Sequence, residues 1–102
     1  MMIDAHQHFW RLDRGDYGWL TPDLTPLYRD YLPGDLAPHL RAHGIDGTVL
    51  VQAAPTIGET EFLLDIAEKT PFVMGVVGWV DLASDRCVEQ LEEFKDHDKF
   101  VG

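Results

Sequence analysis

Two histidines that lie one residue apart, His6 and His8, are the residues of this sequence best suited to chemistry. They belong to the stretch Ile3–Trp10, which begins as a short apolar run. In a β-strand the side chains at positions i and i+2 point to the same face, so a strand here would aim both imidazoles at one point. Imidazole is both a common metal ligand and a common hydrogen-bonded polar group. The spacing alone therefore predicts either half of a metal site or two structural histidines.

The elements that must position these histidines alternate between strand and helix. Apolar, β-branched runs predict strands at the N-terminus and over 45–54 and 72–80, and 99–102 looks like the opening of a fourth. Start and stop signals predict helices from Pro33 to Gly44, from Thr56 through Ala67, and after Ser84. Because parallel strands are joined by helical crossovers, this order predicts an α/β fold with a parallel sheet.

Particular residues are expected to define the ends and faces of these helices. Thr56 and Glu59 match a capping box, in which a hydroxyl and a carboxylate satisfy free N–H groups at a helix start. Ser84 is the expected N-cap of the last helix, whose inward face is predicted to consist of Cys87, Val88, Leu91 and Phe94. We interpret Cys87 as a small buried residue rather than a nucleophile.

A long irregular segment, 10–32, separates the first strand from the first helix. Loops of this length at a strand end are usually functional or disordered. The density of aromatic residues favours an ordered, aromatic-lined cover; they are Trp10, Tyr17, Trp19, Tyr28 and Tyr31. Their rings suit a sugar or lactone ring, and they equally suit the simpler task of pinning the loop to the body.

Composition restricts the class of protein. The 102 residues have a net charge of -10 and a hydrophobic content of 45%, which indicate one globular domain without the basic surface that nucleic acid or an anionic membrane requires. A single cysteine allows no internal disulfide. No apolar run approaches the ~20 residues of a membrane span, and no signal-peptide pattern opens the chain. A cytoplasmic enzyme is therefore expected.

Four stretches in order carry a resemblance to a known family. They are Ile-Asp-Ala-His-Gln-His-Phe-Trp at 3–10, Tyr-Gly-Trp-Leu at 17–20, Val-Gln-Ala-Ala at 51–54 and Gly-Val-Val-Gly-Trp-Val-Asp at 75–81. This series resembles the amidohydrolase superfamily, and within it the amidohydrolase family 2 branch, which includes sugar-acid lactonases of the L-fuconolactonase and L-rhamnono-lactonase type. The resemblance runs from residue 3 to the last residue.

The resemblance implies a fold. The parallel βα units are similar to the first three to four units of a (β/α)₈ TIM barrel, which takes about 250 residues. Residues 1–102 would then be the N-terminal portion of a single barrel domain, with sheet edges and apolar faces left for the rest of a longer enzyme or for further copies in a homo-oligomer. A small doubly wound sheet that folds by itself is the alternative.

The resemblance also implies site residues. His6 and His8 match the family's catalytic histidines, which bind a divalent metal, zinc first among the candidates, together with a later histidine and aspartate that have no counterpart here. Some lactonases of this branch are expected to work without tightly bound metal, with the histidines orienting the carbonyl. Trp10, Gln52 and Trp79 lie at predicted strand ends and are expected to contact substrate. Asp81 is expected to be a loop or capping group instead of the catalytic acid.

The function that follows is hydrolysis of a sugar-acid or related lactone by water attack on its carbonyl, carried out by the full-length parent and not by residues 1–102 alone. Within the enzyme class, a decarboxylase or an amide hydrolase uses the same scaffold. Outside it, the alternative is a small acidic α/β binding or assembly module in which both histidines are structural.

Overall fold

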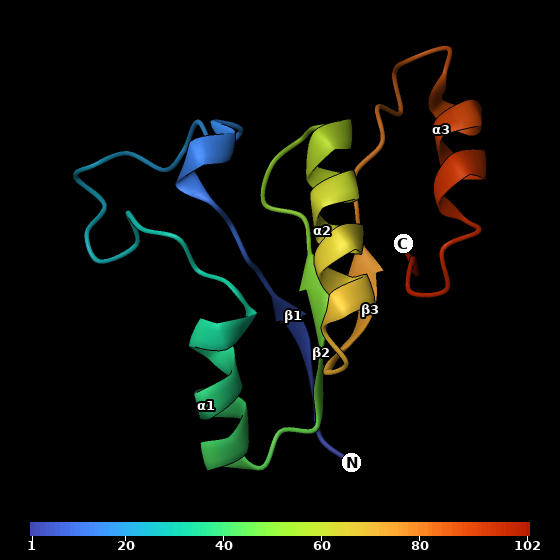
Figure 1. Ribbon diagram of the computed structural model, residues 1–102. Helices are drawn as coiled ribbons and strands as arrows, with labels where there is room; N and C mark the ends of the chain where they lie inside the picture. Colours follow the sequence, from blue (N-terminus) through green and yellow to red (C-terminus); the bar gives the residue numbers. More distant parts are fainter.

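The computed structural model describes all of residues 1–102 and shows three parallel strands that alternate with helices (Figure 1). The elements are β1 (Ile3–Gln7), the short 3₁₀ helix η1 (Leu12–Arg14), α1 (Pro33–His43), β2 (Gly47–Val51), α2 (Ile57–Lys69), β3 (Val73–Val77) and α3 (Cys87–Phe94). The strand order in the sheet is β1-β2-β3, so neighbours in sequence are neighbours in space. The predicted α/β fold is confirmed.

The sheet continues beyond β3 with the last residues of the chain. The N–H of Val76 donates to the carbonyl of Lys99 at 2.7 Å, and Val101 N–H donates back to the carbonyl of Val76 at 3.0 Å. This parallel pairing confirms the predicted opening of a fourth strand at 99–102. Both central strands are shorter than predicted over 45–54 and 72–80. At the start of the first of them, for example, Ile45 N–H still bonds to the carbonyl of Leu40 in α1.

One face of the sheet is packed against α2, which lies over β2 and β3 in Figure 1. Residues of both strands and of the helix form the core there, among them Leu50, Leu63, Ala67, Val73 and Val76. Val49 and Val51 alternate along β2 with the buried Thr48 and Leu50, so they point to the other face, and Val77, the register partner of Val51, lies on that face too; each is only partly buried. The strands therefore present one covered face and one open apolar face.

Helix α1 begins and ends where the sequence predicts. Pro33 occupies its first turn, and the side chain of Asp35 accepts a hydrogen bond from the N–H of Leu32 at 2.9 Å. Gly44 ends the helix in the left-handed region at φ 65°, which favours glycine. None of the helices is both long and apolar enough to cross a membrane.

Helix α3 departs from its predicted packing. Of the four residues expected on the inward face, only Phe94 is buried; Cys87 is half-buried, and Val88 is 70% exposed and Leu91 38% exposed. The apolar stripe exists, but residues 1–102 provide no element that packs against its first turn. Ser84 is not the N-cap either: Arg86 holds that position, and the hydroxyl of Ser84, two residues earlier, accepts from the N–H of Arg86 at 3.1 Å.

Candidate active site at the carboxyl ends of the strands

His6 and His8 project from the carboxyl end of β1 as a facing pair. Their ring centroids are 5.0 Å apart and the rings are nearly perpendicular. Gln7 and Phe9, which flank His8, are buried, whereas both histidines are exposed. The prediction that the spacing directs both imidazoles to one side is confirmed.

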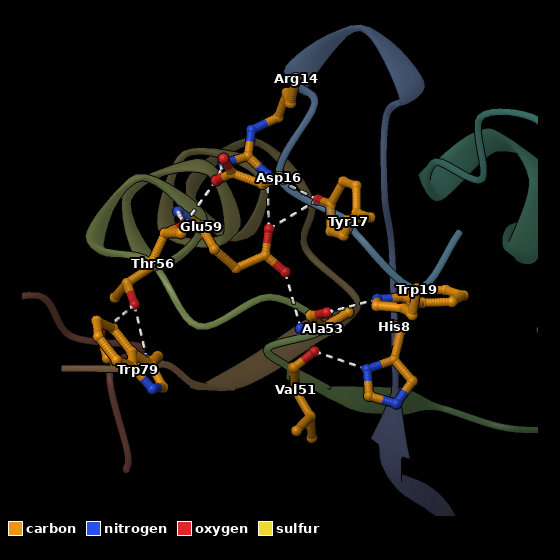
Figure 2. A network of polar contacts seen from close by, with 11 residues as sticks. His8, Arg14, Asp16, Tyr17, Trp19, Val51, Ala53, Thr56, Glu59 and Trp79 are labelled. Carbon is orange, nitrogen blue, oxygen red and sulfur yellow. Dashed lines mark hydrogen bonds and ion pairs between the residues drawn. The ribbon is translucent and has the colours of Figure 1, made fainter. Parts of the chain in front are cut away.

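The ring of His8 is oriented by the neighbouring strand. Its Nδ1 lies 2.8 Å from the carbonyl oxygen of Val51, the last residue of β2, as Figure 2 shows. A carbonyl oxygen only accepts, so Nδ1 carries the proton and donates. The lone pair is then on Nε2, the form in which a neutral imidazole binds a metal or accepts a proton.

The donor set fits part of a zinc site. Two imidazole nitrogens are ligands that zinc prefers, but a zinc site normally needs at least three protein ligands. No group of three or more histidine, cysteine, aspartate or glutamate side chains is arranged to hold a metal ion. His6 and His8 therefore supply half of such a site.

The aromatic residues of the long loop after β1 pin the loop to the body, which is one of the two roles expected for them. The ring of Trp10 packs edge-on against those of Trp19 and Tyr31, with centroid distances of 5.3 and 5.2 Å. The indole N–H of Trp10 donates to the carbonyl of Arg29, and that of Trp19 to the carbonyl of Ala53, just past β2. Both indole N–H groups thus hold the loop in place, while the ring of Trp19 remains 43% exposed.

The other two predicted substrate contacts lie at the ends of β2 and β3. Gln52 is half-buried, and its N–H donates to the carbonyl of Val77 at 2.9 Å. Trp79 is held by its backbone: the hydroxyl of Thr60 accepts from its N–H and donates to its carbonyl, both at 2.7 Å. Figure 2 shows Trp79 well away from His8. Gln52 directly follows the Val51 carbonyl that orients His8.

Asp81 has the capping role that the sequence predicts. Its side chain accepts from the N–H of Ala83 at 3.1 Å, and its carbonyl accepts from the N–H of Ser84 at 2.9 Å. These bonds hold the turn that leads toward α3.

Glu59 is the main residue that sequence reasoning placed incorrectly. The hydroxyl of Thr56 does accept from the N–H of Glu59 at 3.0 Å, as a capping box requires. The carboxylate does not complete the box, however. It is fully buried and accepts from Arg14 Nη1 at 2.7 Å, from the Tyr17 hydroxyl at 2.7 Å and from the N–H of Ala53 at 2.8 Å.

The loop supplies the partners of this carboxylate. Arg14 also donates to Asp16 at 2.9 Å, and Asp16 accepts from the hydroxyl of Thr56 at 2.6 Å (Figure 2). Burial, and after it the hydrogen bond to Glu59, raises the pKa of the Tyr17 hydroxyl well above its ordinary value. The sequence carried the signal, an arginine, an aspartate and a tyrosine within four residues, but no periodicity links them to a residue more than forty positions later.

A pocket of about 280 Å³ opens between β1 and α1 and is lined in part by His8. Its polar lining includes Gln7, His8, Arg29, Asp35 and His39. Gln7 donates from Nε2 to the hydroxyl of Thr48 at 3.0 Å, while its buried Oε1 has no hydrogen-bond partner.

Residues 3–102 match the model of the family described as amidohydrolase. The chain is 45% identical over 100 residues to an L-fucono-1,5-lactonase of Burkholderia ambifaria, and this match covers 98% of the chain and 34% of that protein. It is 39% identical over 95 residues to an L-fucono-1,5-lactonase of Burkholderia multivorans, and this match covers 93% of the chain and 32% of the relative.

The fold of the chain is closely similar to that of a solved structure. It is the crystal structure of an amidohydrolase from Burkholderia multivorans with bound zinc. The two sequences are 38% identical, the TM-score is 0.89, and the match covers 100% of this chain and 36% of the solved chain. The βα units are thus those of a partial (β/α)₈ barrel, as predicted. The chain spans about a third of the length of the relatives it matches.

Proposed function

The chain belongs to the amidohydrolase family, and on that premise we propose that residues 1–102 are the N-terminal portion of a single barrel domain that hydrolyses a sugar-acid lactone. The names of two relatives support a 1,5-lactone of L-fuconic acid as the first candidate substrate. Water attacks the ring carbonyl, and the ring oxygen leaves as a hydroxyl. The product is the open-chain sugar acid.

The observation that carries this function is the pair of imidazoles at the end of β1, with the Nε2 of His8 left free by the bond from Nδ1 to Val51. In this proposal His6 and His8 are the catalytic histidines and hold one divalent ion, zinc first among the candidates. The zinc bound to a solved relative supports that choice. The ion would supply Lewis-acid polarisation of the lactone carbonyl. Without a metal, the same two imidazoles orient the carbonyl.

Substrate contacts are proposed at three side chains. The ring of Trp10 would contact the apolar side of a sugar and the Gln52 amide a ring hydroxyl. Trp79, which lies well away from His8 (Figure 2), would contact a part of the substrate remote from the reacting carbonyl. Gln52 directly follows Val51, whose carbonyl accepts from His8.

The test is ring opening by the full-length parent of residues 1–102. We expect acid release above the uncatalysed rate from 1,5-lactones of sugar acids in a pH-stat, and none from residues 1–102 alone. The parent would instead be a decarboxylase or an amide hydrolase if it left every lactone at the buffer rate and turned over a carboxylate or amide substrate.

A further inference from the structure

The turn at the end of β2, residues 51–53, is held by side chains from three different parts of the chain. The carbonyl of Val51 accepts from His8, and the N–H of Ala53 donates to Glu59, both at 2.8 Å. The carbonyl of Ala53 accepts from the indole of Trp19 at 2.9 Å. Figure 2 shows these contacts converging on the turn. Only Gln52 separates Val51, whose carbonyl orients His8, from Ala53, whose N–H is held by Glu59 and whose carbonyl is held by Trp19.

Glu59 is the charged member of this arrangement, and it is fully buried. Its two oxygens face three donors and no acceptor: Arg14 and Tyr17 at Oε1, and the N–H of Ala53 at Oε2. A buried ion pair is a poor source of net stability, because desolvation offsets most of the attraction. What such a pair does provide is a fixed geometry for the groups around it.

Arg14 is itself held in position. Its guanidinium lies 4.4 Å from the ring centroid of Phe62 in α2 and, besides its bond to Glu59, donates to the Tyr17 hydroxyl and to Asp16. The cation therefore has a defined place against α2, and the carboxylate of Glu59 is fixed between this cation and the turn after β2.

We propose that Glu59 is a positioning residue for His8. By fixing the N–H of Ala53 it fixes the turn that presents the Val51 carbonyl, and this carbonyl keeps the proton of His8 on Nδ1 and the lone pair on Nε2. The role rests on the function proposed above, since the free Nε2 is the atom offered to the metal or to the substrate carbonyl. The role requires a carboxylate and not an amide. In a glutamine at position 59, the side-chain NH₂ group would face a hydrogen-bond donor in either orientation of the amide.

The experiment compares Glu59→Gln with Asp65→Asn in the full-length protein. Asp65 makes a matched control: it is a carboxylate on the same helix, exposed, and paired only with Lys69. Imidazole ¹⁵N spectra, assigned by loss of the His8 signals in His8→Gln, report which nitrogen carries the proton. Spectra are taken after chelator treatment so that no bound metal fixes the tautomer. Steady-state kinetics on the lactone follow in parallel.

We expect His8 to be protonated at Nδ1 in the parent and in Asp65→Asn, and to become a mixture of tautomers in Glu59→Gln. The kcat of Glu59→Gln should fall about tenfold, the lower end of what losing an outer-shell contact to a ligating histidine costs. KM should change less than kcat because, of the proposed substrate contacts, only Gln52 lies in this turn. Unchanged His8 spectra in a folded Glu59→Gln protein would overturn the proposal.

A second variant keeps the test decisive if Glu59→Gln does not fold by circular dichroism. Glu59→Asp keeps the negative charge beside Arg14 but withdraws the carboxylate from the N–H of Ala53 by one methylene group. It should shift the His8 tautomer in the same direction, and an unshifted spectrum would refute the proposal. The ¹⁵N readout needs no turnover, so failure to hydrolyse any lactone counts against the proposed function and leaves the positioning role to be decided by the spectra.

Discussion

Arg14 and Glu59 form a 2.7 Å ion pair in which the carboxylate is fully buried. The arginine belongs to the loop after β1 and the glutamate to the first turn of α2, so one contact ties the aromatic cover to the body. The same carboxylate holds the turn after β2. The loop, the helix and the strand end that surround the histidines are therefore mechanically connected.

Breaking this ion pair from the arginine side should be strongly destabilising. Arg14→Met keeps an apolar stem over Phe62 but leaves the Glu59 carboxylate buried without its cation. We expect the free energy of unfolding of the full-length protein to drop by about 3 kcal/mol or more, as for other buried pairs that lose one partner. Urea denaturation measures it. Arg86→Met, at an exposed pair with Glu89, should leave the midpoint unchanged; equal losses in both variants would contradict a special role of Arg14.

The Tyr17 hydroxyl should make stability depend on alkaline pH. Its pKa is raised in the folded state, by burial first and then by the Glu59 hydrogen bond. Because the folded pKa exceeds the unfolded value of about 10, the hydroxyl contributes fully below that pH and its contribution is lost as pH rises toward the folded pKa. Melting temperatures of the parent and of Tyr17→Phe, measured from neutral to alkaline pH, should therefore converge above about pH 10. A constant gap across that range would show that the pKa of Tyr17 is not raised.

Thr60 should be needed for its hydroxyl and not for its volume. It is fully buried, and its Oγ1 satisfies both the N–H and the carbonyl of Trp79. Thr60→Val keeps the shape and leaves both backbone groups without this partner, which should cost about 1–3 kcal/mol in unfolding free energy. Thr60→Ser keeps the hydroxyl and should lose less. The prediction fails if serine proves the more damaging change.

Gly78 should not accept a side chain. A Cβ there would lie 2.6 Å from Cγ2 and 3.0 Å from Oγ1 of Thr60, so Gly78→Ala would push the Trp79 backbone off its hydroxyl partner. Gly34→Ala is the control, because a Cβ at Gly34 meets nothing within 4 Å. We expect a lower melting temperature and a changed tryptophan emission spectrum for Gly78→Ala alone. Identical behaviour of the two variants would argue against close packing of Gly78 on Thr60.

Much of the fold could be predicted from the sequence because its signals are local. Period and composition indicated the parallel strands, and Pro33 and Gly44 marked both ends of α1. The predicted inward face of α3 was wrong at Val88 and Leu91, which are exposed. An apolar stripe indicates that a helix face is suited to burial, but it does not show which element covers that face. For α3, residues 1–102 contain no such element against the first turn.

Part of the candidate site could likewise be predicted from the sequence, and part could not. The facing of His6 and His8 follows from strand geometry, so it could be predicted. The burial of Glu59 could not, because a threonine followed by a glutamate three residues later reads the same whether the carboxylate returns to the helix start or meets an arginine from a distant loop. Only the tertiary structure decides between these two outcomes.

The most direct measurement is the rate of ring opening of L-fucono-1,5-lactone by the full-length protein and by its His6→Ala, His8→Ala double variant. The parent should open the ring faster than buffer. The double variant, if it melts like the parent, should be slower than the parent by more than about 100-fold, because the ligand pair itself is lost and not merely an outer contact. A folded double variant that keeps the parent rate would contradict a catalytic role for the two histidines.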